Sequence, residues 1–171
     1  MADTAETAIT DDGFVRLAAS AQLRLAPAAL VALLAQGIPG WEELSTVDGI
    51  RRYAVDLRLR LGRPGAALGT FRKAAFVDLG EVRRTVDGHE VEIQWRAATA
   101  APLFPVFSGQ LHIGPHEVWL TGLYAPPGGV VGRVADRALL HVAATGTARW
   151  LLAELNVPRG TPVDGIPSQL A

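Results

Sequence analysis

Apolar and polar residues alternate along much of the chain between residues 15 and 124. The alternation is cleanest at 52–61, where Tyr53, Val55 and Leu57 fall on one side and charged residues on the other. A period of two is typical of strands that bury one face. The pattern therefore predicts six or seven antiparallel strands, at 15–25, 52–61, 68–79, 91–97, 107–113 and 118–124, with EVRRTV at 81–86 as a short addition.

Two short helices are predicted between the first two of these strands. PAALVALLAQ at 27–36 begins with Pro27, which suits a first helical turn, and stops before Gly37. WEELST at 41–46 is read as a second helical piece, followed by a turn at Asp48-Gly49. Helices of this length are marginal alone in water, so both are expected to dock on one edge of the sheet.

A long helix is predicted from Gly129 to Leu155, after the last strand. Its helical period gathers one apolar face, and Arg149 projects from the middle of that face. Small residues make the face shallow, which leaves room for a hollow beneath the helix. The residues of this face are Val131, Val134, Ala135, Ala138, Leu139, Val142, Gly146, Leu152 and Ala153.

The order of these elements predicts one α+β domain at 13–157. An antiparallel sheet with one apolar face is expected to curve, and the C-terminal helix is expected to cross its concave face. Residues 1–12 are acidic and predicted to form a flexible arm, and the Pro/Gly-rich residues 158–171 to form a flexible tail.

Composition narrows the function classes. Sixteen basic and seventeen acidic residues give a net charge of −1, which offers no attraction for nucleic acid or an anionic membrane. No apolar run reaches the roughly 20 residues of a membrane span, and residues 1–13 do not read as a signal peptide, so a cytoplasmic protein is predicted. The absence of cysteine excludes disulfides, thiolate metal sites and thiol catalysis.

Five segments carry a resemblance to a known family: FRKAAFVDLG (71–80), EIQWRAA (92–98), LFPVFSGQLHI (103–113), LTGLYAPPGGVVGR (120–133) and DRALLHVAATGTARWLL (136–152). Together they resemble the START-like superfamily, and most closely its bacterial polyketide cyclase/dehydrase and lipid-transport-like members. The resemblance implies a helix-grip fold, with two short helices after the first strand and a long C-terminal helix across a curved sheet. It also implies a cavity between sheet and helix that holds an apolar or aromatic ligand.

By this resemblance, eight positions would line the cavity: Lys73, Trp95, Phe107, Leu120, Tyr124, His141, Thr145 and Arg149. Lys73 is placed inward because the other register would bury Arg72 and Asp78, at a greater cost. A buried Arg149 would need a carboxylate, carbonyl groups or an anionic ligand, although a structural ion pair or a surface position is also open. For His141 a packing role is the alternative to a role in the cavity, and for Trp95 and Tyr124 the alternative is a core position.

Three functions remain open. The first is the binding or transport of a hydrophobic molecule (a lipid, quinone or polyketide-like compound) without a cofactor. The second is a cyclase/aromatase-type enzyme that uses Tyr124, His141 or Lys73 for proton transfer, although no acid/base pair is evident. The third is an interaction module, such as a homodimer, built on Trp119 and Leu123, which the alternation places on the outer face of the last strand.

Other chemistry finds little support. His112 and His116 flank a Gly-Pro turn but lack the third ligand of a metal site. The glycine-rich GRPGAALG has neither the lysine nor the helix of a phosphate loop, and the sequence has no G-x-S-x-G motif.

Overall fold

The computed structural model describes residues 4–10, 14–60, 70–98, 106–125 and 137–157. Within these ranges the chain forms two helices, α1 (Pro27–Gln36) and α2 (Arg137–Leu155), and a sheet of nine strands. The strands are β1 (Thr4–Ile9), β2 (Val15–Gln22), β3 (Glu42–Val47), β4 (Ile50–Arg60), β5 (Thr70–Leu79), β6 (Arg83–Thr85), β7 (Gly88–Ala97), β8 (Val106–Ile113) and β9 (Glu117–Ala125).

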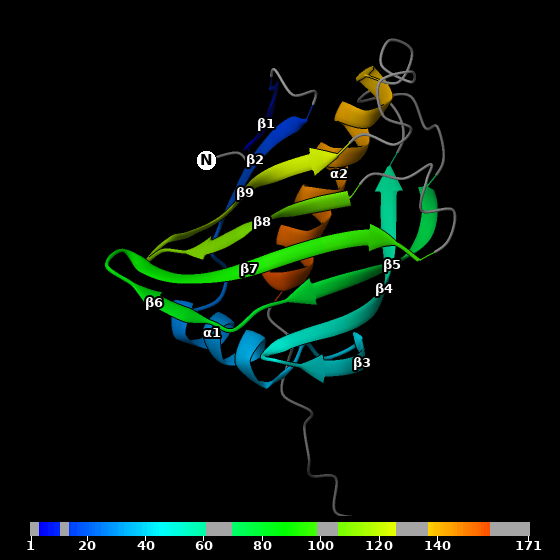
Figure 1. Ribbon diagram of the computed structural model, residues 1–171. Coiled ribbons are helices and arrows are strands. Elements are labelled where there is room, and N and C mark those ends of the chain that lie inside the picture. The colour runs from blue at the N-terminus through cyan, green and yellow to red at the C-terminus, as the bar shows by residue number, and fades with distance from the viewer. Residues whose placement is uncertain (1–3, 11–13, 61–69, 99–105, 126–136, 158–171) are drawn as a thin grey trace, which may run out of the picture.

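The sheet is antiparallel throughout the described residues. Eight strands follow the order β1-β2-β9-β8-β7-β5-β4-β3, and β6 pairs with β7 beside this path. Most neighbours are also neighbours in sequence, but β2 pairs with β9 over its whole length, from Val15 opposite Tyr124 to Gln22 opposite Glu117. This pairing brings the N-terminal strands beside the last strand. Figure 1 shows α2 on one side of the sheet.

The buried face of the sheet follows the alternation read from the sequence. In β7, Val91, Ile93, Trp95 and Ala97 are buried, and the residues between them are exposed. In β5 the predicted register is confirmed at Ala75, Val77 and Leu79, which are buried. Asp78 lies on the other face and accepts two hydrogen bonds of 2.7 Å from Arg52. One face of the sheet is therefore core, and the other carries paired polar groups.

The predicted helix-grip architecture is wrong. Residues 4–9, expected in a flexible arm, form β1 along β2, and the described residues hold nine strands in place of six or seven. The predicted second helix at 41–46 is instead the exposed strand β3, so α1 alone lies between β2 and β3. Both Asp48 and Gly49 have positive φ, 50° and 77°, as a two-residue hairpin turn requires. That turn needs strands on both sides, which excludes a helix directly before it.

The predicted helix at 27–36 is confirmed as α1, with Leu30 and Leu34 buried one turn apart and Gly37 at its C-terminal end. The long C-terminal helix is described from Arg137, and residues 129–136 lie outside the described residues. Helix α2 contacts β1, β2, β4 and β9.

The predicted face of α2 is confirmed at Leu152 and wrong at Arg149 and Ala153, and the side chains of residues 137–143 lie outside the described part. Arg149 and Ala153 are exposed and Gly146 is half-buried. The side that packs inward comprises Ala144, Thr145, Ala148, Leu151, Leu152 and Leu155. Burial follows the three large leucines near the C-terminal end, because they remove the most apolar surface from water. The face predicted from the sequence counts glycine and alanine equally with leucine, although they bury much less apolar surface.

Candidate functional site

Three aromatic side chains form a row across the buried face of the sheet. Trp95 on β7 lies opposite Phe107 on β8, and Phe107 lies opposite Tyr124 on β9. The Trp95 and Phe107 rings are stacked, with centroids 3.8 Å apart and planes inclined by 13°. All three residues are at most 4% exposed. The sequence placed them together correctly, because neighbouring strands bring alternate residues onto one face.

Two glycines allow the Phe107 ring to lie close to the sheet. Gly109 and Gly122 are opposite each other on β8 and β9. A Cβ built on Gly109 would lie 2.6 Å from Cζ of Phe107, and one built on Gly122 would lie 2.5 Å from it. These distances are too short for any side chain larger than hydrogen, so the ring occupies the space above the glycine pair.

Tyr124 carries the hydroxyl group of the aromatic row. Burial raises the pKa of its hydroxyl well above the ordinary value, because the phenolate would lose its hydration. The hydroxyl therefore stays protonated at neutral pH. It can donate a hydrogen bond to a ligand, and it does not act as a general base there.

Helix α2 adds a buried hydroxyl without a partner to the same side of the sheet. Thr145 is 9% exposed, and its Oγ1 has no hydrogen-bond partner in the described part of the protein. Threonine in a helix often bonds a carbonyl of the preceding turn, so an unpaired buried hydroxyl is unusual. Leu120 on β9 is fully buried.

Of the other predicted ligand residues, the structure describes only the side chain of Arg149. The backbone of Lys73 pairs with Leu57, but the side chains of Lys73 and His141 lie outside the described part. Arg149 is exposed, so the expected buried guanidinium does not occur and needs no compensating anion. Of the eight predicted positions, the structure therefore buries Trp95, Phe107, Leu120, Tyr124 and Thr145.

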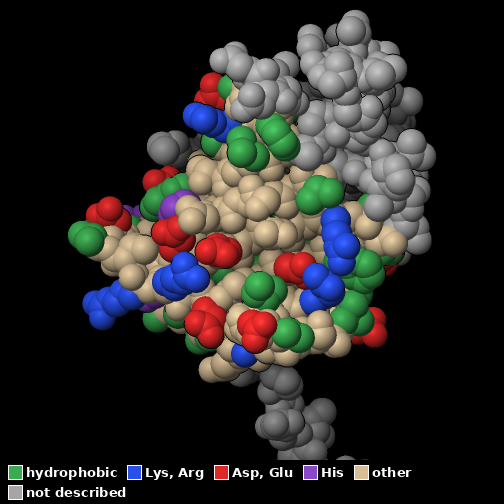
Figure 2. Space-filling model, in the orientation of Figure 1, with side chains coloured by type: hydrophobic (Ala, Val, Ile, Leu, Met, Phe, Trp, Pro, Cys, Tyr) green, Lys and Arg blue, Asp and Glu red, His purple; other side chains and the backbone are tan. Residues whose placement is uncertain are grey.

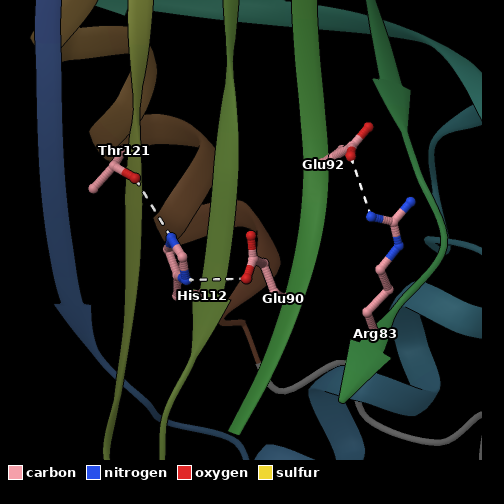
Figure 3. Close-up of polar contacts among 5 residues, drawn as sticks. All are labelled: Arg83, Glu90, Glu92, His112 and Thr121. Atoms are coloured by element: carbon pink, nitrogen blue, oxygen red, sulfur yellow. Dashed lines mark hydrogen bonds and ion pairs between the residues drawn. The ribbon is translucent and has the colours of Figure 1, made fainter. Parts of the chain in front are cut away.

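A second polar group lies on the outer face of the sheet (Figures 2 and 3). His112 lies between Glu90 and Thr121, with Nδ1 3.9 Å from a Glu90 oxygen and Nε2 3.5 Å from Thr121 Oγ1. Nearby, Arg83 contacts Glu92 at 3.4 Å. Figure 2 shows that uncharged side chains and backbone make up the middle of this face, with charged side chains below.

The order carboxylate, imidazole, hydroxyl is that of a nucleophilic triad, but the geometry does not support one. Both contacts are at or beyond the limit of a hydrogen bond. Thr121 lies within the β8–β9 ladder, where backbone N–H groups pair between strands, so the ladder does not supply an oxyanion hole beside it. The group is best described as an outer-face polar network.

The predicted outward positions of Trp119 and Leu123 are confirmed. Both alternate with buried residues of β9, and Leu123 is 43% exposed. The His112 ring covers Trp119 in a near-parallel stack, with centroids 5.3 Å apart. The stack covers part of this large apolar ring on the outer face.

The described residues contain neither a candidate metal site nor a candidate membrane-spanning helix. They contain no cluster of three or more side chains that could hold a metal ion. None of their helices is long and apolar enough to cross a membrane.

The sequence analysis missed one polar group on the buried side, formed by Arg51 and Tyr53 near Gly37. Tyr53 was recognised only as an inward residue of its strand. The alternation places Arg51 on the same face as Tyr53, two residues away, and this was the only signal for the pair.

Comparison with known proteins identifies no family for this chain. The resemblance to the START-like superfamily therefore stays a prediction. No protein-family model matches the sequence, and no curated protein matches it either.

Proposed function

We propose that this protein binds a hydrophobic small molecule between the buried face of the sheet and α2, in the cytoplasm. The observation that carries the proposal is the Thr145 hydroxyl, which is buried against the apolar sheet without a hydrogen-bond partner among the described residues. A buried hydroxyl without a partner costs about 1–3 kcal/mol. A ligand with a carbonyl or ether oxygen would remove that cost.

The aromatic row supports the same class of ligand. Stacked Trp95 and Phe107 offer flat apolar surface, and Tyr124 offers a protonated hydroxyl. Binding sites for small molecules commonly combine such walls with a few polar groups that fix orientation. A quinone or a polyketide-like compound has both the flat body and the carbonyl oxygens that these residues would contact.

Binding is favoured over cyclase-type catalysis. Proton transfer needs an acid and a base within reach of one ligand. Apart from the two tyrosines, the buried polar residues of the described chain are Thr145, Thr147 and Asn156, none of which titrates near neutral pH. Tyr124 alone supplies a donor without a paired base.

The test compares ligand binding by the full chain with that of Thr145→Val. A neutral naphthoquinone and the neutral dye Nile red serve as probes, with binding followed by tryptophan quenching, dye fluorescence and the shift in Tm. We expect both probes to bind the wild type. Thr145→Val should raise the Tm of the free protein and weaken naphthoquinone binding by about tenfold, while Nile red binding is retained.

Thr147→Val is the matched control, because Thr147 is similarly buried on the same helix but its hydroxyl is not among the fully buried polar atoms without a partner. It should not weaken naphthoquinone binding. The proposal would be overturned if the wild type bound neither naphthoquinone nor Nile red at near-millimolar concentration. Equal loss of naphthoquinone binding in the two variants would overturn the role of Thr145.

A further inference from the structure

Three polar side-chain atoms surround one point at the C-terminal end of α1. A Cβ built on Gly37 would lie 3.8 Å from Oε2 of Glu43, 3.8 Å from Oη of Tyr53 and 3.9 Å from Nη1 of Arg51. Glu43 and Tyr53 are opposite each other on β3 and β4, and Arg51 precedes Tyr53 by two residues on β4. The sheet edge therefore brings a carboxylate, a hydroxyl and a guanidinium around a single position.

Two of these three atoms are buried hydrogen-bond donors without partners in the described chain. Oη of Tyr53 and Nη1 of Arg51 are inaccessible to solvent, and neither has a hydrogen bond. Tyr53 as a whole is only 1% exposed. Buried donors are nearly always paired in proteins, so two unpaired donors beside one point indicate that an acceptor belongs there.

Glu43 does not provide that acceptor. Its Oε1 accepts a hydrogen bond of 2.6 Å from Thr46 Oγ1, which holds the carboxylate on β3. Among the described residues no ion pair within 4.0 Å joins Glu43 to Arg51. Glu43 is exposed, and its other oxygen, Oε2, lies near the same point.

Gly37 keeps the point free of protein atoms. Its φ of 114° and ψ of 150° are accessible to glycine and strained for other residues. A Cβ at Gly37 would make ordinary van der Waals contact with the three surrounding atoms, so they pack less closely around glycine than they would around any other residue. A ligand oxygen would have to lie beyond this position, with a small shift of the surrounding side chains, to accept hydrogen bonds from Arg51 and Tyr53.

An aromatic wall adjoins the two donors. The edge of Trp41 contacts Tyr53, with ring centroids 5.6 Å apart and planes at 72°. Trp41 in turn lies parallel to Trp150 of α2, with centroids 6.2 Å apart. These half-buried indoles offer apolar surface to the body of a molecule whose oxygen reaches the donors.

We propose that Arg51 and Tyr53 bind the carboxylate of a small monoanion with an apolar or aromatic body. The guanidinium and the hydroxyl would each donate a hydrogen bond to a carboxylate oxygen. Glu43 lies near the same position and would repel any negative charge there, so it weakens binding of a monoanion and disfavours phosphate and dicarboxylates more strongly. The site is separate from the hydrophobic ligand proposed above and does not depend on it.

The test is titration of the full chain with sodium benzoate, followed by tryptophan fluorescence, since Trp41 adjoins the site, and by calorimetry. We expect saturable binding at constant ionic strength, with inorganic phosphate unable to compete. Tyr53→Phe keeps the ring and its contact with Trp41 but removes the donor, and Arg51→Met removes the charge. Each should weaken benzoate binding about tenfold or more.

Arg16→Met is the control for loss of one positive charge, because Arg16 is exposed on β2, away from β3 and β4. It should leave the affinity unchanged. Glu43→Gln changes an exposed residue and keeps the fold testable if a core variant fails to fold. It should strengthen benzoate binding several-fold and let phosphate compete.

Three results would overturn the site: no saturable response to benzoate at tens of millimolar, equal affinity in the wild type and Tyr53→Phe, or no change in Glu43→Gln. A wild type that binds no Nile red but binds benzoate would refute the hydrophobic ligand and leave this site standing.

Discussion

Asn156 joins the end of α2 to the end of β2, and its removal gives the most direct test of how the helix is held. Asn156 is 3% exposed. Its Oδ1 accepts a hydrogen bond of 2.7 Å from the backbone N–H of Arg24, and its Nδ2 donates to the carbonyl of Gln22. One amide therefore satisfies two backbone groups that lie more than 130 residues away in sequence.

Substitution Asn156→Asp preserves the shape of this side chain and, at neutral pH, removes one hydrogen bond. At pH 7 the carboxylate still accepts from Arg24, but it cannot donate to Gln22 and faces that carbonyl with a negative charge. An unsatisfied buried carbonyl costs about 1–3 kcal/mol, and burial of a charge adds to this. We expect the free energy of unfolding to fall by about 2–4 kcal/mol.

The loss in free energy of unfolding caused by Asn156→Asp should depend on pH. When protonated, the introduced carboxyl can donate to Gln22 and accept from Arg24, as the amide does. The folded state therefore holds this proton more tightly, and the pKa of the carboxyl is higher folded than unfolded, where it is about 3.9. The stabilising effect of that proton is complete below the unfolded pKa and is lost as the pH rises through the folded pKa.

Urea denaturation at pH 7 and pH 4.5 measures both effects. Asn156→Ala is the control, because it loses the same two bonds without adding a titratable group. The difference in free energy of unfolding between Asn156→Asp and Asn156→Ala should be smaller at pH 4.5 than at pH 7, or should change sign. This account of the contact would be refuted if both variants lost less than about 1 kcal/mol in free energy of unfolding. It would also be refuted if the difference between the two variants did not change with pH.

Three further predictions concern single positions. Gly146→Ala should raise the free energy of unfolding by about 0.5–1 kcal/mol, measured by urea denaturation, because the glycine is helical and its Cβ would meet no atom within 4 Å. Gly122→Ala should lower it by about 1–3 kcal/mol or more in the same assay, since its Cβ would lie 2.5 Å from both Phe107 Cζ and the Ser108 carbonyl oxygen. Tyr124 has a pKa that is raised in the folded state above the ordinary 10.0, so stability should fall as the pH rises above that value, and less steeply in Tyr124→Phe.

The strands and their inward sides could be predicted because one period of two governs both. Val91, Ile93 and Trp95 alternate with polar residues, and a one-residue slip would expose all three. The prediction failed at residues 41–46, where a short helix was chosen although Asp48-Gly49 signals a hairpin. In that segment the turn residues carried more information than the composition of the six residues before them.

The inward face of α2 could not be read from its period alone. Leucines at 151, 152 and 155 set the rotation of the helix, whereas the face predicted from the sequence includes Leu152 but omits Leu151 and Leu155 and places Arg149 inside. A helix with few large apolar residues fits several rotations almost equally well by pattern. The contacts with β2 and β4 select one of them.

The candidate ligand-binding residues also divide into those that could be brought together from the sequence and those that could not. Trp95, Phe107 and Tyr124 could be brought together from sequence, because strand order and alternation fix their neighbours. The pairing of Arg51 with Tyr53 around Gly37 could not, since it requires the end of α1 to meet β4 at a specific position. Contacts between a helix end and a sheet edge leave no period in the sequence.

The unpaired donors also bear on why both proposals involve ligands with acceptor oxygens. Each unsatisfied buried polar group costs about 1–3 kcal/mol, and a whole domain is stable by only about 5–15 kcal/mol. Thr145, Tyr53 and Arg51 together therefore carry a cost that is large on this scale. An apolar side chain of the same shape would avoid it at each position. Their retention is accounted for if molecules with acceptor oxygens occupy these positions, so Thr145→Val and Tyr53→Phe should each stabilise the free protein while weakening binding of its own ligand.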